Sequence, residues 1–487
     1  MRSHRYNRLG RTALCAVVTV LLTTGCDFLD PTNVTNPNTT TEDLASANDP
    51  TAALMPGLRA QMARAVRAVV QTTALVSDDY EIAFTSVGPE LSDPHAVQPD
   101  GASYNSSGAI GAYWNLQELR AFADFVIDTI ASQDDGATDE QLAEAHYYRG
   151  MAFLMQGENF IAVPTGPDLA PAPWDDLLGR AAADFNTALT LGAGAELEVG
   201  LNAALSRTHR ALGNAAEAAS FAQAALALDD DFVWSQRYSE GEIENPFPGD
   251  SRAFQPLPRL DFLDPKYTDR SAPIALAKAE EMHLILAEVA MRSGRLIDYI
   301  AAAGHIEDAL ALALTRPRAD FNDSQDQRLN PDLSLRPSSS DMLVAAEPGA
   351  PFRAGLVLDR PGTVDVPTVS GTSQDPGAVG SLVDPEEIRY AFWLARQEIL
   401  FLEGRRVHDL GVRMPVALRE IDTSSAISEG DAATEVQVPA YIPEGVIDGF
   451  SPRDPYAAST NEITIDVDMN RVLAEEMVSP LGTLPNP

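Results

Sequence analysis

The chain has 487 residues and a formal net charge of −37, from 34 Lys and Arg against 71 Asp and Glu. A surface this acidic repels phosphate backbones, which argues against a general nucleic-acid binder. Hydrophobic residues make up 45% of the chain, which argues against global disorder. The length allows either several domains or one large helical body with long insertions.

The N-terminus has the pattern of an export signal. Four Arg precede an apolar run from Ala13 to Leu22, which is too short to span a bilayer. Small residues and Gly25 then lead into Cys26. This order resembles a bacterial lipobox, and it predicts cleavage before Cys26 and attachment of lipid to its thiol and new amino group. An ordinary secretory signal with a chance cysteine is the alternative.

Cysteine content supports this interpretation. The chain has two cysteines, Cys15 and Cys26, and Cys15 lies in the apolar run that cleavage would remove. One remaining cysteine excludes an intrachain disulfide and a cysteine zinc cluster. Residues 26–48 are rich in Asn, Thr, Asp and Pro, so they are predicted to form a lipidated flexible tether.

Helical periodicity dominates from residue 49 onwards. The first predicted helix begins near Pro50 and has one apolar face. Further helices are predicted over residues 114–130, 140–155, 174–191, 202–212, 215–228, 275–291, 296–314 and 385–402. Long irregular segments separate them at 235–272, 315–384 and 415–462, and loops of this kind on a rigid scaffold are typical places for a binding surface.

The helices over 202–212 and 215–228 fit a tetratricopeptide template in part. Leu205 and Ser206 occupy the first helix, and Ala218 and Ala225 lie seven residues apart in the second. Small residues are needed there because packed helices approach closely.

Three regions in order resemble one known family. Residues 26–31 (CDFLDP) follow the lipobox, residues 143–164 read AEAHYYRGMAFLMQGENFIAVP, and residues 395–410 read ARQEILFLEGRRVHDL. Together they resemble the SusD/RagB family of outer-membrane nutrient-binding lipoproteins. The last region matches the family signature at Arg396, Glu398, Phe401, Glu403, Gly404, Arg406, Asp409 and Leu410.

The resemblance implies a mostly α fold, an α-α superhelix with four tetratricopeptide-like helix pairs and long irregular loop insertions. It divides the chain into a lipoprotein signal peptide (1–25), the tether (26–48), a SusD-like N-terminal region (49–240) and a C-terminal region with ligand and partner loops (241–487). It also implies an outer-membrane location facing the cell exterior, and a SusC-like TonB-dependent barrel as partner. The ligand would be an oligosaccharide or oligopeptide.

Some positions depart from the family pattern. Ala395 replaces an acid, residues 411–413 replace an Arg-Trp sequence, and the ending SPLGTLPNP differs from the usual one. The chain is therefore identified as a divergent member, and its ligand is not transferred from starch-binding relatives.

The charged cluster at 396–409 has two interpretations, an active site or a structural ion-pair network. Alternating carboxylates and guanidinium groups favour the structural one. No HExxH, Gly-x-Ser-x-Gly or Walker motif occurs, so no catalytic residue, metal site or cofactor is predicted. Residues 320–326 alternate oxygen ligands but lack the EF-hand Gly and Glu, which leaves a looser calcium site open beside an Asx-rich turn.

Ligand candidates come from the aromatic residues, because sugar rings stack on aromatic faces while their hydroxyls bond to polar groups. Trp393 and Trp114 are predicted to be core residues. The candidates are Trp234, Tyr238, Trp174 and Tyr104.

The predicted function is a lipid-anchored binding protein and not an enzyme. One alternative is a tetratricopeptide scaffold for envelope assembly, which would show more regular repeats. The other is a lipoprotein glycosidase or peptidase, which would need a nucleophile or metal motif.

Overall fold

The computed structural model describes residues 49–82, 91, 93–99, 111–249, 254–322, 337, 339–445 and 447–487. The predicted signal peptide and tether, Cys26, Tyr104 and most of the calcium candidate stretch lie outside the described residues. The chain divides into two units, Met1–Pro50 and Thr51–Pro487, and the description below concerns the second.

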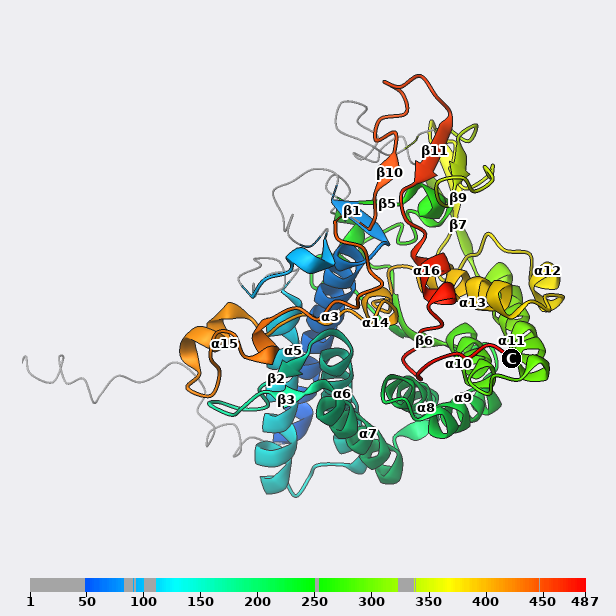
Figure 1. Cartoon of the computed structure of the whole chain (residues 1–487). Helices are drawn as coiled ribbons and strands as arrows, with labels where there is room; N and C mark the ends of the chain where they lie inside the picture. Colours follow the sequence, from blue (N-terminus) through cyan, green and yellow to red (C-terminus); the bar gives the residue numbers. More distant parts are fainter. Residues whose placement is uncertain are drawn as a thin grey trace, which may run out of the picture. The chain divides into compact units, whose positions relative to one another are not determined.

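Helices form most of this unit (Figure 1). The α-helices are α3 (Pro50–Val76), α5 (Ala112–Asp124), α6 (Asp139–Asn159), α7 (Trp174–Leu191), α8 (Gly194–Ala211), α9 (Ala215–Leu228), α10 (Ala279–Met291), α11 (Leu296–Thr315), α12 (Pro376–Gly380), α13 (Pro385–Ile399), α14 (Arg406–Asp409), α15 (Leu418–Thr423) and α16 (Met469–Glu475). Shorter 3₁₀ or π turns are η4 (Pro94–Ala96), η5 (Phe125–Ile130), η6 (Ala131–Gln133), η7 (Phe247–Gly249), η8 (Pro258–Leu263) and η11 (Ala432–Thr434).

The strands are short and form five small sheets in the described part of the chain. They are β1 (Tyr80–Ile82), β2 (Ala162–Val163), β3 (Ala172–Pro173), β4 (Val233–Gln236), β5 (Phe254–Pro256), β6 (Ile274–Lys278), β7 (Arg318–Asn322), β8 (Leu343–Ala345), β9 (Thr363–Pro367), β10 (Phe450–Ser451) and β11 (Glu462–Ile465). The pairs β1–β5, β2–β3, β4–β6 and β7–β9 are antiparallel, and β11 joins β10 to a parallel β8. Several of these strands lie inside the segments predicted as irregular.

Consecutive helices pack in chain order from α5 to α11. The pairs α6/α7, α8/α9 and α10/α11 are joined by tight turns or a small sheet, and Gln61 of α3 donates a hydrogen bond to the Asn115 carbonyl of α5 at 3.2 Å. In the pair α8/α9, Ser206 Oγ donates to the Ala218 carbonyl at 2.8 Å across the interface. The mostly α architecture with tetratricopeptide-like helix pairs follows the sequence prediction.

Local sequence sets the helix ends. Thr138 and Gln141 form a capping box at the start of α6, and the Asp384 carboxylate accepts from two backbone amides at the start of α13. Gly192 ends α7 with a φ of 83°, a conformation that a side chain would oppose.

Three predicted helices differ clearly from the structure. The helix predicted over 202–212 is α8, which already begins at Gly194. Residues 275–278 were predicted to begin a helix, but they belong to β6, which pairs with β4 from the preceding insertion. This pairing is not local in sequence, so the helical period of 279–291 extends wrongly into it. The helix predicted over 114–130 is α-helical to Asp124 and continues as the π-helical η5.

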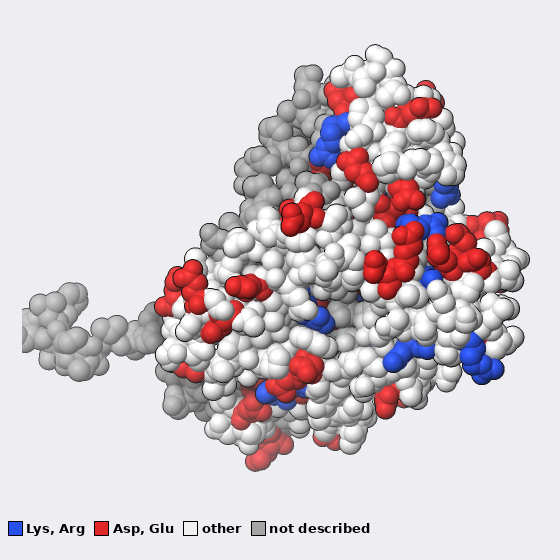
Figure 2. All heavy atoms as spheres, viewed as in Figure 1, with Lys and Arg blue, Asp and Glu red and all other residues white. Residues whose placement is uncertain are grey.

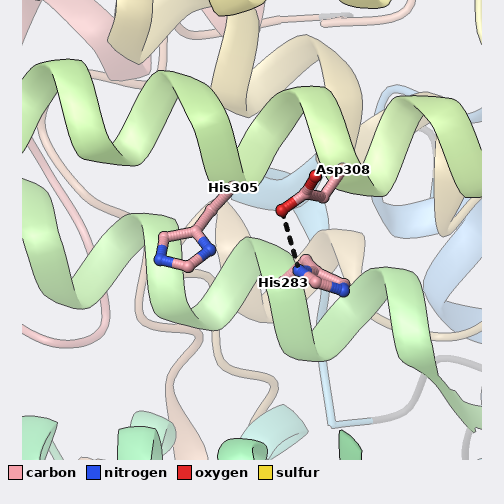
Figure 3. A group of neighbouring side chains, drawn as sticks. All are labelled: His283, His305 and Asp308. Atoms are coloured by element: carbon pink, nitrogen blue, oxygen red, sulfur yellow. Dashed lines mark ion pairs between the residues drawn. The ribbon is translucent and has the colours of Figure 1, made fainter. Parts of the chain in front are cut away.

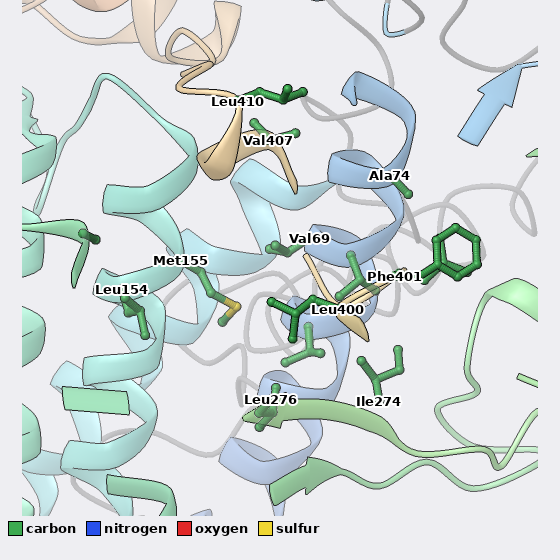
Figure 4. Close-up of a cluster of buried hydrophobic side chains, with 14 of the residues drawn as sticks. Val69, Ala74, Leu154, Met155, Ile274, Leu276, Leu400, Phe401, Val407 and Leu410 are labelled. Carbon is green, nitrogen blue, oxygen red and sulfur yellow. The ribbon is translucent and has the colours of Figure 1, made fainter. Parts of the chain in front are cut away.

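One large hydrophobic core joins distant parts of the chain. Figure 4 shows Val69 and Ala74 of α3, Met155 of α6 and Leu276 of β6 gathered around Leu400 and Phe401. The same core cluster includes Leu484 near the C-terminus, so residues from both 49–240 and 241–487 contribute to it.

The surface is predominantly acidic. Figure 2 shows separate clusters of Asp and Glu on the visible face and fewer Lys and Arg. No helix in the described ranges combines the length and the apolar character that crossing a bilayer requires.

Candidate ligand-binding site

A pocket of about 330 Å³, hereafter the aromatic pocket, lies between α6, the start of α8 and β4. Its volume falls in the range of small-molecule sites. Its lining combines three aromatic rings with three carboxylates, and it comprises Glu140, Glu144, Tyr147, Tyr148, Ala193, Gly194, Ala195, Glu196, Leu197 and Trp234.

Trp234 is held firmly at one wall of the aromatic pocket. Its indole N–H donates to the Tyr147 hydroxyl at 2.7 Å, and the two rings meet edge to face at 6.1 Å between centroids. The Trp234 ring also lies directly against Gly200 of α8, where a Cβ would come within 2.7 Å of it. The glycine therefore makes room for the indole, and the ring keeps one orientation.

Tyr148 and Glu144 form another part of the lining. The Tyr148 hydroxyl donates to Glu144 Oε1 at 2.7 Å, and Arg59 of α3 grips the same carboxylate with contacts of 2.6 and 2.7 Å. Burial and the Glu144 charge raise the pKa of Tyr148, so this phenol keeps its proton. Glu140 and Glu196 are exposed, which leaves their carboxylates open to a ligand.

This arrangement provides what sugar recognition requires. Partly buried Tyr148 and Trp234 offer apolar ring surface, while carboxylate oxygens accept hydrogen bonds from hydroxyls.

A second pocket of about 460 Å³, the insertion pocket, lies on the other side of β4. Successive side chains of a strand point to opposite faces, so Val233 and Ser235 line the insertion pocket while Trp234 lines the aromatic pocket. The other residues around it are Arg237, Tyr238, Lys266, Tyr267, Ser271, Pro273, Ala275, Thr368 and Val369.

The structure describes three of the four predicted aromatic ligand residues, and these three do not line one common pocket. Tyr238 was selected as an exposed ring, but it is only 7% exposed, and its hydroxyl donates to the Ala63 carbonyl at 3.3 Å. Trp174 begins α7 and is stacked under the Arg413 guanidinium at 4.1 Å from its ring centroid. It belongs to neither pocket lining, and Tyr104 lies outside the described residues.

Tyr147, Tyr148 and Glu196 were not selected from the sequence. The two tyrosines occupy a helix that periodicity assigns to the core, and Tyr147 is indeed buried. Their neighbourhood with Trp234 arises because β4 returns to α6 across more than 80 residues of chain, as the separation of 87 between Tyr147 and Trp234 shows. A side-by-side pair of tyrosines was the one available signal.

Five charged residues of 396–409 form buried ion pairs, namely Arg396, Glu403, Arg405, Arg406 and Asp409. Arg396 binds Asp409 with two contacts of 2.8 and 3.0 Å, and Arg210 of α8 reaches the same carboxylate at 2.9 Å. Arg406 binds Asp78 with contacts of 2.5 and 2.8 Å. All of these groups are buried and paired, so they connect distant segments of the chain.

Glu403 is the acceptor for the only two lysines of the chain. Lys266 and Lys278 approach its Oε1 atom at 2.5 and 2.6 Å, and all three side chains are buried. Burial lowers the pKa of Lys266 to about 8, while the Glu403 carboxylate opposes that shift. The following Gly404 has a φ of 77°, which lets the chain turn from α13 into α14.

Glu398 accepts hydrogen bonds from the hydroxyls of Thr372 and Ser373 at 2.8 and 2.6 Å. Burial raises the pKa of Glu398 despite these bonds. The contacts attach α13 to the insertion before it. For the calcium candidate, Asp320 and Asn322 lie on β7, and the remaining ligands fall outside the described residues.

No protein-family model matches the chain, and no curated protein is detectably similar to it. Solved structures do match. A SusD-like carbohydrate binding protein from Bacteroides vulgatus is 12% identical over 74% of this chain and 83% of its own, with a TM-score of 0.46. A SusD superfamily protein from Bacteroides thetaiotaomicron is 13% identical over 78% of this chain and 98% of its own, with a TM-score of 0.47.

A SusD/RagB family protein from Bacteroides thetaiotaomicron is 10% identical over 78% of this chain and 96% of its own, with a TM-score of 0.46. Each of these three structures carries a SusD name, and their identity to this chain is 10 to 13%.

Proposed function

We propose that this protein is a divergent SusD-like lipoprotein that binds an oligosaccharide in the aromatic pocket and delivers it to a SusC-like TonB-dependent barrel. The aromatic pocket carries the proposal, because it sets ring surface and free carboxylates around one cavity of about 330 Å³. The Bacteroides vulgatus structure is named a carbohydrate binding protein. For this chain, carbohydrate binding is proposed because of the residues that line its own aromatic pocket.

The location rests on the N-terminal sequence. A lipid on Cys26 would anchor the protein to the outer membrane facing the cell exterior, and residues 26–48 would give slack between the lipid and the folded unit. Two or three acyl chains on one cysteine anchor a protein stably, where a single chain would not.

The proposed mechanism contains no covalent step. A pyranose ring would lie against Tyr148 and Trp234, while its hydroxyls donate to Glu140 and Glu196. Release would follow when the protein swings on its barrel and opens the bound site to the channel. Locking the two proteins together by cross-links should therefore stop uptake, and unchanged uptake would argue against the swing.

The test measures binding of the full chain, purified in mild detergent, to an array of neutral and acidic oligosaccharides and to an oligopeptide library. Tyr148→Ala and Glu196→Gln should each weaken oligosaccharide binding by about tenfold or more, because each removes a direct contact. Two controls should bind normally. Tyr456→Ala removes a 43% exposed tyrosine outside the pocket, and Arg237→Ala alters the insertion pocket.

Loss of binding in Arg237→Ala with normal binding in Tyr148→Ala would move the site to the insertion pocket. Binding of peptides alone would refute the proposed ligand class. If nothing binds and the chain is isolated with envelope assembly factors, the scaffold alternative is favoured.

A further inference from the structure

A cluster of two histidines and an aspartate lies between α10 and α11, and none of its residues lines either ligand pocket. His283 lies on α10, and His305 and Asp308 lie on the facing side of α11 (Figure 3). One donor atom from each of the three side chains lies within 4.8 Å of the other two, and His283 Nδ1 is 3.7 Å from Asp308 Oδ2. Positions 305 and 308 are three apart, so both side chains project from the same face of α11.

One imidazole nitrogen of each histidine in this cluster has no hydrogen bond among the described residues. Nδ1 of His283 and Nδ1 of His305 are both buried, and neither has a hydrogen-bond partner among the described residues. A buried polar atom without a partner is unfavourable, and native structures normally supply one.

Another histidine–aspartate pair in the same chain shows what an ordinary contact looks like. His146 Nδ1 lies 2.7 Å from Asp184 Oδ1, and Arg149 completes that carboxylate's contacts at 2.7 and 2.9 Å. The separation of 3.7 Å between His283 and Asp308 is too long for such a hydrogen bond. The His146–Asp184 pair is therefore already hydrogen-bonded, whereas His283 and Asp308 are not hydrogen-bonded to each other.

The surroundings suit a cation that arrives from solvent. A cavity of about 610 Å³ borders the cluster, and its lining includes Asp230, Asp231, His283 and Asp308. The Asp308 side chain is 60% exposed, so an ion can reach it. Asp231 already pairs with Arg316 at 2.5 Å. The other two aspartates in the cavity lining are Asp230 and Asp308.

We propose that His283, His305 and Asp308 form a binding site for a divalent transition metal of the zinc class. Two imidazole nitrogens and one carboxylate oxygen are a donor set that Zn²⁺ prefers, with water in the fourth position. Calcium and magnesium prefer oxygen donors alone, so the histidines select against them.

Zinc coordination brings ligand atoms to about 3.3 Å from each other, given metal–ligand bonds of about 2.0–2.1 Å. Binding therefore needs side-chain rotations that shorten the distances between ligand atoms by up to about 1.5 Å. The backbone of α10 and α11 already places the three residues next to each other. The bound ion would connect the two helices of the last tetratricopeptide-like pair, α10 and α11. This inference is independent of the proposed ligand pocket.

The test is a zinc titration of the full chain in detergent, carrying an affinity tag without histidine and first stripped with a chelator. Excess Mg²⁺ is kept present, because it occupies sites made of carboxylates alone. The wild type should bind one Zn²⁺ per chain, and Co²⁺ in its place should give the visible spectrum of a tetrahedral site.

His305→Gln and Asp308→Asn should each weaken zinc binding by about tenfold or more. Asp308 is exposed, so Asp308→Asn is expected to fold normally. The test therefore remains valid even if His305→Gln fails to fold. His209→Gln is the matched control, since His209 lies on another helix pair and stacks on Phe221. A wild type that binds no zinc, or an Asp308→Asn variant that binds it as tightly as the wild type, would overturn the proposal.

Discussion

Asp78 and Asp79 are adjacent and both buried, yet their pKa values move in opposite directions. Burial alone would raise the pKa of Asp78, but Arg406 and Arg259 outweigh it and hold the pKa below its usual range. Burial and the neighbouring Asp78 charge raise the pKa of Asp79 to about 7. The charged Asp78 carboxylate therefore lies beside the Asp79 carboxyl group, whose protonated form is favoured by its surroundings.

The Asp79 shift predicts a pH-dependent stability. Because its folded pKa exceeds the unfolded one, the stabilisation is complete below about pH 4 and is lost as the pH rises through about 7. The Asp79→Asn variant has no carboxyl group to ionise at this position, so it does not lose this stabilisation as the pH rises. The free energy of unfolding of the variant relative to wild type should rise by roughly 2–3 kcal/mol from pH 5 to pH 8, measured by urea denaturation. An equal difference at both pH values would refute the assignment.

Gly200 tests the wall of the aromatic pocket. A methyl group at this position would come within 2.7 Å of the Trp234 ring, so Gly200→Ala must displace the indole. We expect a loss of roughly 1–3 kcal/mol in stability, a shifted tryptophan fluorescence and weaker oligosaccharide binding.

The matched control for Gly200→Ala is Gly179→Ala on α7, where nothing lies within 4 Å of the added methyl. That change should leave binding unaltered and stabilise the helix by about 0.5–1 kcal/mol. Identical fluorescence and binding in the two variants would show that the pocket wall does not depend on this close approach.

At the scale of elements, the helices with strong local signals were predictable. α7 and α9 match their predicted ranges of 174–191 and 215–228, because apolar spacing and helix-ending residues lie within each segment. β6 was not predictable, since its strand character comes from pairing with β4. The same pairing of β4 with β6 also forms the candidate site, because it holds Trp234 beside Tyr147.

The turn from α13 to α14 carries two buried charged side chains, Glu403 and Arg405, that are paired with other elements. Glu403 pairs with Lys266 and Lys278, and Arg405 beside it binds Glu281 with contacts of 2.9 and 3.2 Å. These bonds connect the turn to β6 and α10, so the turn holds the C-terminal helices on the tetratricopeptide-like pairs.

Glu403→Gln should destabilise the protein strongly, because two buried ammonium groups would lose their only carboxylate within 4 Å among the described residues. Removing one partner of a buried ion pair typically costs about 3–5 kcal/mol, which denaturant unfolding would detect. Glu386→Gln, at a 51% exposed position on α13, should change the free energy of unfolding by less than about 0.5 kcal/mol. Equal unfolding midpoints for the two variants would contradict a structural role of Glu403.

At the scale of the whole molecule, the sequence indicated the mostly α architecture through periodicity and the excess of acidic groups through composition. It could not indicate which aromatic side chains remain accessible. Tyr238 opens a polar segment and was predicted to be exposed, but the helix packing around Ala63 buries it. Burial of a given ring depends on elements that are distant in the sequence, and the pattern around the ring does not report it.

The central claim is that this protein works with a membrane transporter. The most direct test is affinity isolation of the full-length protein from native membranes in mild detergent, with partners identified by mass spectrometry. We predict recovery of a TonB-dependent barrel in near-equal amount. Recovery of the protein alone, or with periplasmic assembly factors, would contradict the account and reduce the SusD-like resemblance to one of fold.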